Sequence, residues 1–393
     1  MEQFQVNGVE PFRLVVTGGG TGGHTYPALT AVRTLQARLA AEGRVLETLW
    51  IGTADGLEAR VAPAAGIPFT TVATGKIRRS KNPIKLASPA NVKDMARVPL
   101  GVIQARKAID RFRPDVVLAT GGYVAVPAGL AARMCHRPLV LHEQTVRLGL
   151  ANRKLAASAA RICVSSESTL DLLSESARQV AVVTGNPVRP EVLTGHADKA
   201  VQALRLWGFD RQLPTVYVTG GAQGAQQINE LIGDVLPWLL AMANVVHQCG
   251  PDNVGGLRAR AARLPAELQG RYHLTGFVGP ELPDVLALAD VVVSRSGAGT
   301  LAELTALGKP AVFVPLASSA GNEQAHNARH LEQAGAAVAL VGEVTADELR
   351  SAVGPLLADA HLRWAMVERA RAYGRPDAAD RLVDVILSAA ASG

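Results

Sequence analysis

The chain has 393 residues, with 40 lysines and arginines against 34 aspartates and glutamates, and 48% of its residues are hydrophobic. This length suggests two or three domains, and the ordinary apolar content excludes a disordered or fibrous chain. Aromatic residues make up only 4%, so the core must consist of Ala, Val, Leu and Ile, which suits helices packed on a buried parallel sheet.

The three cysteines lie far apart and form no C-x-x-C pair, so we expect neither a disulfide framework nor a zinc site, and a reducing cytoplasm fits. The N-terminal residues lack the basic and apolar regions of a signal peptide. The longest charge-free apolar stretch, 116–132, contains glycine and proline and is too short to cross a membrane. The sequence therefore predicts a soluble protein.

Two segments about 200 residues apart share the order strand, glycine-rich turn, helix. In the first, an apolar run from Arg13 ends in Gly18-Gly-Gly-Thr-Gly-Gly23, and a helical pattern follows over 27–41. In the second, residues 215–219 lead into Gly220-Gly-Ala-Gln-Gly224 and a helical pattern over 228–242. Each half therefore opens as a Rossmann-like unit would.

Further short apolar runs predict strands along both halves. They are 46–51, 116–119, 139–141, 161–164, 180–183, 245–248, 291–294 and 311–314. Helical stretches separate most of them, which indicates βα alternation twice over. Gly185-Asn-Pro-Val-Arg189 is the natural boundary, and the C-terminal helix over 362–391 is broken at Gly374-Arg-Pro-Asp377. We therefore predict an α/β chain of two Rossmann-like, doubly wound parallel-sheet domains facing across a cleft.

The positive charge is concentrated in residues 73–113. Eleven basic residues in this segment face only Asp94 and Asp110, so the segment carries +9 and the rest of the chain sums to −3. Apolar residues lie among the charges, so the segment can dock on an anionic membrane surface at about 1 kcal/mol per basic residue. The alternative is a solvated basic helix face. Nucleic acid is disfavoured, because no aromatic residue accompanies the charges before Phe112.

Four glycine-containing turns follow predicted strands: 18–23, Gly121-Gly122, 220–224 and Ser296-Gly-Ala-Gly-Thr300. Such turns expose backbone N–H groups at a helix start and suit phosphate, although one alone often only reflects a need for positive φ. Together they favour a diphosphate ligand. No acidic residue follows the first turn as in dinucleotide-binding proteins, and neither a Walker A motif nor D-x-D occurs. Charge neutralisation would fall to N–H groups, helix dipoles and an arginine rather than a metal.

Two polar groups at strand or helix ends are candidate functional residues. His24 directly follows the first glycine turn at a helix start, where it would point toward a phosphate or a sugar hydroxyl; the alternative is a surface or N-cap histidine. His142-Glu143-Gln144 follows the strand at 139–141, either as a functional cluster or as a hydrogen-bonded strand end.

Several motifs in order resemble the MurG family of peptidoglycan glycosyltransferases. They are Gly19-Gly-Thr-Gly-Gly-His24 with Pro27-Ala-Leu29, Gly121-Gly-Tyr-Val124, His142-Glu-Gln144, Gly185-Asn-Pro-Val-Arg189, Gly220-Gly-Ala-Gln-Gly-Ala225 and Ser294-Arg-Ser-Gly-Ala298. The resemblance implies a GT-B fold and an inverting transfer of N-acetylglucosamine from UDP-N-acetylglucosamine to the C4 hydroxyl of lipid I, which gives lipid II without a metal or cofactor.

The resemblance also implies a cellular location for the chain and a separate function for each domain. It implies a peripheral protein on the cytoplasmic face of the inner membrane, held to anionic lipid by residues 73–113 and working beside other cell-wall synthesis proteins. Residues 1–188, with a C-terminal helix at 374–393 returning to them, would form the acceptor and membrane-docking domain. Residues 189–373 would bind the nucleotide sugar.

Carried over by position, the resemblance assigns site residues. Thr21, Gly22 and Gly23 would lie at the sugar diphosphate; Arg189, Ala222 and Gln223 at the nucleotide diphosphate; Val278 at uracil; Ala298, Gly299, Thr300, Leu301 and Glu303 at the nucleoside; Gln324 at N-acetylglucosamine; and Tyr123, His142, Glu143 and Thr145 on the acceptor side. His24 is the candidate base, or it binds a phosphate of lipid I instead.

Two positions depart from the family pattern. Thr145 stands where the family usually has Asn, which puts a substrate contact in doubt, and Ala222 replaces a serine in the second glycine turn while keeping its backbone N–H. Rival functions are another UDP-sugar lipid glycosyltransferase, a sugar-nucleotide epimerase and a non-catalytic UDP-sugar-binding membrane scaffold.

Overall fold

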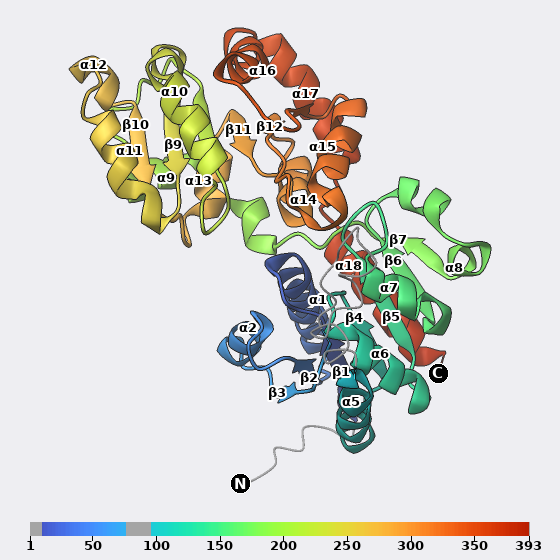
Figure 1. The fold of residues 1–393 in the computed structure, drawn as a ribbon. Coiled ribbons are helices and arrows are strands. Elements are labelled where there is room, and N and C mark those ends of the chain that lie inside the picture. The colour runs from blue at the N-terminus through green and yellow to red at the C-terminus, as the bar shows by residue number, and fades with distance from the viewer. Residues whose placement is uncertain (1–9, 76–95, 393) are drawn as a thin grey trace. The chain divides into compact units, whose positions relative to one another are not determined.

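The computed structural model describes residues 10–75 and 96–392, which form two compact units (Figure 1). Unit 1 comprises Met1–Pro187 together with Asp377–Gly393, and unit 2 is Val188–Pro376. The sequence predicted the division after residue 188 and a return at 374.

Unit 1 contains a parallel sheet with the strand order β3-β2-β1-β4-β5-β6-β7 among the described residues. Its strands are β1 (Phe12–Thr17), β2 (Leu46–Gly52), β3 (Phe69–Thr71), β4 (Val116–Ala119), β5 (Leu139–Glu143), β6 (Arg161–Val164) and β7 (Ala181–Val183). The central strands are apolar throughout, as β4 shows with four buried residues, because helices cover both faces of such a sheet. The strand order reverses between β1 and β4.

The helices of unit 1 follow its strands along the chain and are completed by the C-terminal helix. They are α1 (Gly22–Ala41), α2 (Glu58–Ala64), α5 (Val98–Phe112), α6 (Ala125–Met134), α7 (Leu150–Leu155), α8 (Glu175–Gln179) and α18 (Ala378–Ala391). Helix α18 packs beside α1 and buries Leu382, Val383 and Ile386 in the unit 1 core, and Arg38 of α1 pairs with Asp384. The last helix is thus part of the first unit.

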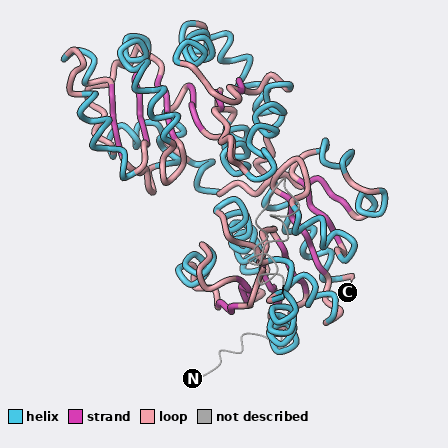
Figure 2. Tube along the Cα trace, viewed as in Figure 1, coloured by secondary structure: helices cyan, strands magenta, loops and turns pink. Residues whose placement is uncertain are grey.

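Unit 2 contains a second parallel sheet, with the order β10-β9-β8-β11-β12-β13 in the described chain (Figure 2). Its strands are β8 (Thr215–Thr219), β9 (Asn244–Gln248), β10 (Tyr272–Thr275), β11 (Val291–Ser294), β12 (Ala311–Phe313) and β13 (Val338–Ala339). The order reverses between β8 and β11.

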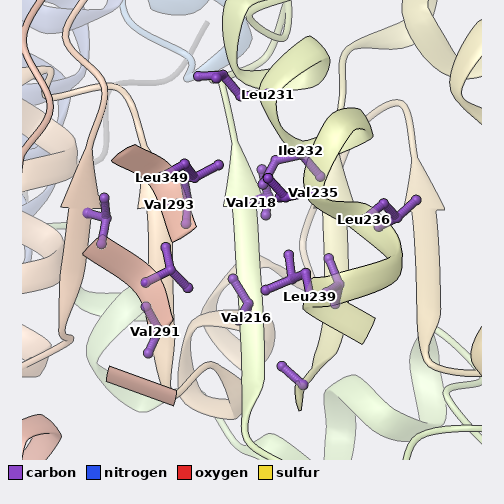
Figure 3. Close-up of a cluster of buried hydrophobic side chains, with 14 of the residues drawn as sticks. Val216, Val218, Leu231, Ile232, Val235, Leu236, Leu239, Val291, Val293 and Leu349 are labelled. Atoms are coloured by element: carbon purple, nitrogen blue, oxygen red, sulfur yellow. The ribbon is translucent and has the colours of Figure 1, made fainter. Parts of the chain in front are cut away.

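The helices of unit 2 pack on this sheet around an aliphatic core. They are α9 (Ala197–Ala203), α10 (Gln226–Met242), α11 (Val254–Ala261), α12 (Ala266–Gln269), α13 (Leu282–Leu288), α14 (Ala298–Leu307), α15 (Glu323–Gln333), α16 (Ala346–Ala358) and α17 (Ala360–Tyr373). Figure 3 shows β8 and β11 valines meeting α10 and Leu349 of α16. The expected aliphatic core is present.

The prediction of two Rossmann-like parallel-sheet domains, the fold class of GT-B enzymes, is confirmed. The sequence missed β3, β10 and β13, all at sheet edges. β3 and β10 carry polar residues, as edge strands often do, and so leave no continuous apolar run to recognise. β13 lies within the apolar run 336–341, which was not assigned from the sequence. Helix α1 also begins at Gly22, five residues before the apolar pattern that predicted it.

Candidate functional site

The four glycine turns lie at the two positions where the strand order reverses. In unit 1, turn 18–23 follows β1 and Gly121-Gly122 follows β4, which are neighbouring strands. In unit 2, turn 220–224 follows β8 and turn 296–300 follows β11, also neighbours. Ligands of open parallel sheets bind at the carboxyl edge at such a reversal. Each unit therefore has one candidate site, built from two turns.

His24 lies in the first turn of α1 and contacts both turns of unit 1. Its Nδ1 is 2.8 Å from Thr21 Oγ1, and its carbonyl accepts a hydrogen bond from Thr120 Oγ1 at 2.9 Å. A Cβ at Gly121, which has φ +99°, would lie 2.8 Å from the Cδ2 of His24 and 3.1 Å from its Nε2. The imidazole thus rests on the Gly121 backbone, a close approach that only glycine permits.

The surroundings keep His24 neutral at pH 7. Burial lowers its pKa to about 4, while the nearby Glu58 carboxylate opposes that shift. The positive end of the α1 dipole also disfavours the charged ring. A neutral imidazole is the form that can accept a proton, and the lowered pKa makes His24 a weaker base than an ordinary histidine.

His142 supports the site from beneath. It is fully buried, and its Nε2 lies 3.0 Å from the Gly185 carbonyl, so Nε2 must carry the proton and Nδ1 accepts from Gln144 Nε2. Burial lowers the His142 pKa to about 4. Gln144 Nε2 also lies 2.8 Å from the carbonyl of Thr120, the residue that holds His24. In this structure His142 therefore joins the end of β5 to the segment after β7 and, through Gln144, to the turn after β4.

Glu143 is also buried and organises the segment after β5. Its Oε1 accepts from the Thr145 N–H at 3.1 Å and hydroxyl at 2.9 Å, and its Oε2 accepts from Gly149 N–H and Asn152 Nδ2. Burial raises the Glu143 pKa, and these hydrogen bonds oppose the rise. The threonine at position 145 thus has a structural partner, and the polar strand-end network describes this cluster best.

Tyr123 connects the turns to a cavity of about 640 Å³ on unit 1. Its ring lies against Gly20, where a Cβ would approach Cε1 to 3.2 Å. The cavity lies beyond the ends of β2 and β3 and is mostly polar, with Thr53, Ala54, Asp55, Thr71, Val72, Ala73, Thr74, Arg97, Leu100, Gln104 and Tyr123 as its lining. The cavity therefore adjoins the first glycine turn, because Tyr123 borders both.

In unit 2, Gln248 joins turn 220–224 to Val278, the residue predicted to contact uracil. Its Nε2 donates to the Gly221 carbonyl at 2.8 Å, and its Oε1 accepts from Val278 N–H at 2.9 Å. The Val278 N–H is therefore already hydrogen-bonded. A predicted uracil contact through the Val278 backbone would either replace the Gln248 hydrogen bond or use the Val278 carbonyl. Ala222 and Gln223 are exposed at the tip of the same turn, where their N–H groups border solvent.

Arg189 and Glu303, predicted for opposite ends of a nucleotide, form an ion pair. Arg189 Nε donates to Glu303 Oε1 at 2.8 Å, with side-chain exposures of 35% and 17%. Glu303 lies on α14, whose first turn contains the predicted Ala298, Gly299, Thr300 and Leu301. The predicted nucleoside and diphosphate residues on α14 and at Arg189 thus lie in one place on unit 2.

Gln324 lies close to the turn after β11. The Ser296 hydroxyl donates to its carbonyl at 2.8 Å, and its own Oε1 accepts from the Leu316 N–H at 3.0 Å. The half-buried Arg295 donates to Gln227 and to two carbonyls after β12, and burial lowers its pKa. These contacts fix the shape of the turn from which α14 begins.

Residues 76–95 of the basic segment 73–113 lie outside the described residues, and they hold six of its eleven basic residues: Lys76, Arg78, Arg79, Lys81, Lys85 and Lys93. The described part is α5, on which Leu100 and Ile103 are exposed. No helix in residues 10–75 and 96–392 is long and apolar enough to cross a membrane. Over the same residues, no group of three or more His, Cys, Asp or Glu side chains is placed to hold a metal ion.

Sequence reasoning missed several residues that shape both sites. Thr120, Asn152, Glu58 and Gln248 all bridge segments distant in the chain, at separations of 9 to 96 residues. No local motif marks them. A buried polar residue within or just after an apolar strand is the one available signal, and Thr120 and Gln248 meet that description.

Two family models match the chain: the glycosyltransferase family 28 N-terminal domain over residues 14–164 and the C-terminal domain over 215–382. A protein of Listeria welshimeri is 35% identical over 95% of this chain and 99% of its own length, and one of Exiguobacterium sibiricum is 36% identical over 95% and 98%. Both are named UDP-N-acetylglucosamine--N-acetylmuramyl-(pentapeptide) pyrophosphoryl-undecaprenol N-acetylglucosamine transferase.

Among solved structures, Acinetobacter baumannii MurG superposes with a TM-score of 0.74 at 28% identity, over 96% of this chain and all of that one. The sequence match covers nearly the full length of both relatives, and the structural match covers both units. The resemblance read from the motifs is therefore confirmed, and the chain belongs to glycosyltransferase family 28 and, within it, to the MurG family.

Proposed function

We propose that the protein transfers N-acetylglucosamine from UDP-N-acetylglucosamine to the C4 hydroxyl of undecaprenyl-pyrophosphoryl-N-acetylmuramyl-pentapeptide (lipid I), giving lipid II for peptidoglycan. Its family membership supports the substrates. The observation that carries the chemistry is His24, a neutral imidazole held between two glycine turns at the reversal point of the unit 1 sheet.

His24 acts as the general base in this proposal. The acceptor oxygen attacks the anomeric carbon, its proton passes to Nε2 of His24, and the bond from that carbon to the diphosphate breaks so that UDP leaves with the electron pair. In this step Nδ1 carries the ring proton and donates to Thr21 Oγ1, 2.8 Å away, so Nε2 is the nitrogen that accepts the proton. A positioned base contributes about 10²–10⁴-fold to such a step.

Unit 2 binds the donor in this proposal. Turn 220–224 and Arg189 stabilise the diphosphate, and α14 with Glu303 holds the nucleoside. The Arg189–Glu303 pair supports this assignment, because a guanidinium beside a carboxylate can meet a phosphate and a ribose hydroxyl from one location. Gln324 would contact the sugar.

Unit 1 binds the acceptor and the membrane surface in this proposal. The cavity beside Tyr123 receives the part of the acceptor beyond the reacting sugar. The exposed Leu100 and Ile103 on α5, together with the basic residues of 73–113, support docking as a peripheral enzyme on the cytoplasmic face of the inner membrane.

The test compares parent and His24→Ala with radiolabelled UDP-N-acetylglucosamine and a lipid I analogue. We expect disaccharide product from the parent and a fall in kcat of about 10²-fold or more in the variant, with donor binding retained. A parent that binds the donor but gives no product would refute the transferase and favour a UDP-sugar-binding scaffold. Product only with another lipid acceptor would identify a related lipid glycosyltransferase.

A further inference from the structure

Glu58 is a buried carboxylate beneath the first glycine turn. It is the first residue of α2, and its exposed fraction is 0%. Its Oε2 accepts a hydrogen bond from the Gly20 N–H at 2.9 Å, and its Oε1 accepts from the Thr53 N–H at 3.1 Å and hydroxyl at 2.9 Å. Both oxygens accept, so the hydrogen bonds fit the ionised form. A buried charge is costly unless it is paired in this way.

Three glycines make room for this carboxylate. A Cβ at Gly19 would lie 2.2 Å from Glu58 Cδ, one at Gly56 would lie 2.2 Å from Oε1, and one at Gly52 would lie 2.6 Å from Cγ. None of the three has positive φ, so backbone conformation does not explain them. The chain therefore keeps space for Glu58 from three separate positions, including one inside the turn that precedes His24.

The contacts of Glu58 lead directly to the candidate base. Glu58 holds Gly20, which has φ +80° and has Tyr123 packed against its other side. The next residue is Thr21, whose hydroxyl is 2.8 Å from the Nδ1 of His24. The residue that the carboxylate anchors is thus the direct chain neighbour of the residue that orients the imidazole.

Glu58 also influences His24 through its charge. The charged or titratable groups that act on His24 are Glu58 and the buried His142 of β5. His142 donates its Nε2 proton to a carbonyl and is neutral, so Glu58 is the anion of this pair. A carboxylate near an imidazole stabilises the imidazolium that forms as a base takes up a proton.

We propose that Glu58 is a positioning residue for the transfer reaction: it fixes the 18–23 turn so that His24 is presented to the acceptor, and its charge stabilises the imidazolium formed on His24. The role of Glu58 in the reaction rests on the proposed function, whereas its role in fixing the 18–23 turn can be tested without measuring activity. It extends the site to a residue that touches no substrate.

The test uses Glu58→Gln, which keeps the size of the side chain and removes its charge. A carboxamide has one acceptor oxygen, so its NH₂ must face the N–H of either Gly20 or Thr53. We expect kcat to fall about 10- to 100-fold, as for a misplaced catalytic group, with the donor Kd changed by less than twofold. In NMR titrations the His24 pKa falls below the parent value, and the Gly20 amide loses protection from hydrogen exchange.

Glu58→Asp separates the two effects, because it keeps the charge but is one methylene shorter. We expect its His24 pKa to stay nearer the parent value while the Gly20 amide is still exposed to exchange. Glu47→Gln is the charge control, since Glu47 is a surface residue of β2 paired with Arg13. Val61→Ala is the stability control, since Val61 packs from α2 against the same core without touching the turn.

The outcomes distinguish the two proposals. Glu58→Gln with kcat within twofold of the parent, or with a loss no greater than that of an equally destabilised Val61→Ala, overturns the positioning role. A parent without transfer activity refutes the proposed function instead. The Gly20 exchange and the His24 titration then decide the role of Glu58, and unchanged values in both would refute it.

Discussion

The contact between Gly121 and His24 predicts a large catalytic effect from one added methyl group. In Gly121→Ala, the new Cβ would lie 2.8 Å from His24 Cδ2, whereas carbon atoms prefer about 3.5–4.0 Å. The ring or the turn must therefore move by about 1 Å. A misplacement of that size costs about 10²-fold in rate, so we expect kcat to fall by one to two orders of magnitude.

The loss of stability caused by backbone strain at position 121 must be distinguished from the loss of rate caused by displacing His24. An alanine at φ +99° costs about 1–2 kcal/mol, which lowers Tm by about 2–8 °C in a unit of this size. Gly43→Ala is the matched control: Gly43 has φ +70°, follows α1, and has no atom within 4 Å of the added Cβ. It should lose stability without losing rate.

The assay measures kcat and donor KM with a lipid I analogue, and Tm by circular dichroism, for the parent and both variants. We expect Gly121→Ala to lower kcat with donor KM unchanged, because the proposed function assigns donor binding to unit 2, and Gly43→Ala to lower only Tm. Equal kcat values for the two variants would refute the idea that the Gly121 backbone positions His24.

Three further results follow from the geometry. Glu303→Gln removes a charged acceptor for a ribose hydroxyl, so donor KM should rise about tenfold in initial-rate measurements, and an unchanged KM would exclude the contact. Ile103→Asp should reduce cosedimentation with phosphatidylglycerol vesicles several-fold while transfer to a detergent-solubilised acceptor is retained; unchanged binding would move the docking surface away from α5. Acid should lower Tm, because the fold favours neutral imidazoles with pKa values of about 4 against about 6.5 in the unfolded chain. That stabilisation is complete above pH 6.5 and is lost as pH falls toward 4, so a flat Tm over this range would contradict it. The histidines concerned are His24, His142 and His247.

The sequence predicted the central strands closely because they are buried on both faces. The strands at 116–119, 161–164 and 291–294 begin and end where the apolar runs do. The edge strands β3 and β10 were missed, since a strand with one neighbour needs no continuous hydrophobicity, whereas β13 was missed although residues 336–341 are all apolar. The order of the strands in each sheet could not be read from the local sequence pattern, because packing between distant segments decides which strands are neighbours.

The glycine turns, which supply the backbone groups of the candidate site, could be predicted from the sequence. The glycine turns and His24 are contiguous in sequence, so their pattern is visible. The supporting residues were not, because Glu58 and Thr120 are joined to the first turn across gaps of 38 and 96 residues. No local motif marks this glutamate or this threonine, because each contacts the turn only after distant segments have packed together.

The packing of α18 determines the order in which the units can be completed during synthesis. Unit 2 is a continuous stretch, 188–376, and all its strands and helices are available before α18 emerges. Unit 1 starts first but lacks Leu382, Val383 and Ile386 until α18 has been synthesised. All elements of unit 2 are therefore available while the core of unit 1 is still incomplete. A truncation just before α18 would damage the core of unit 1 rather than that of unit 2.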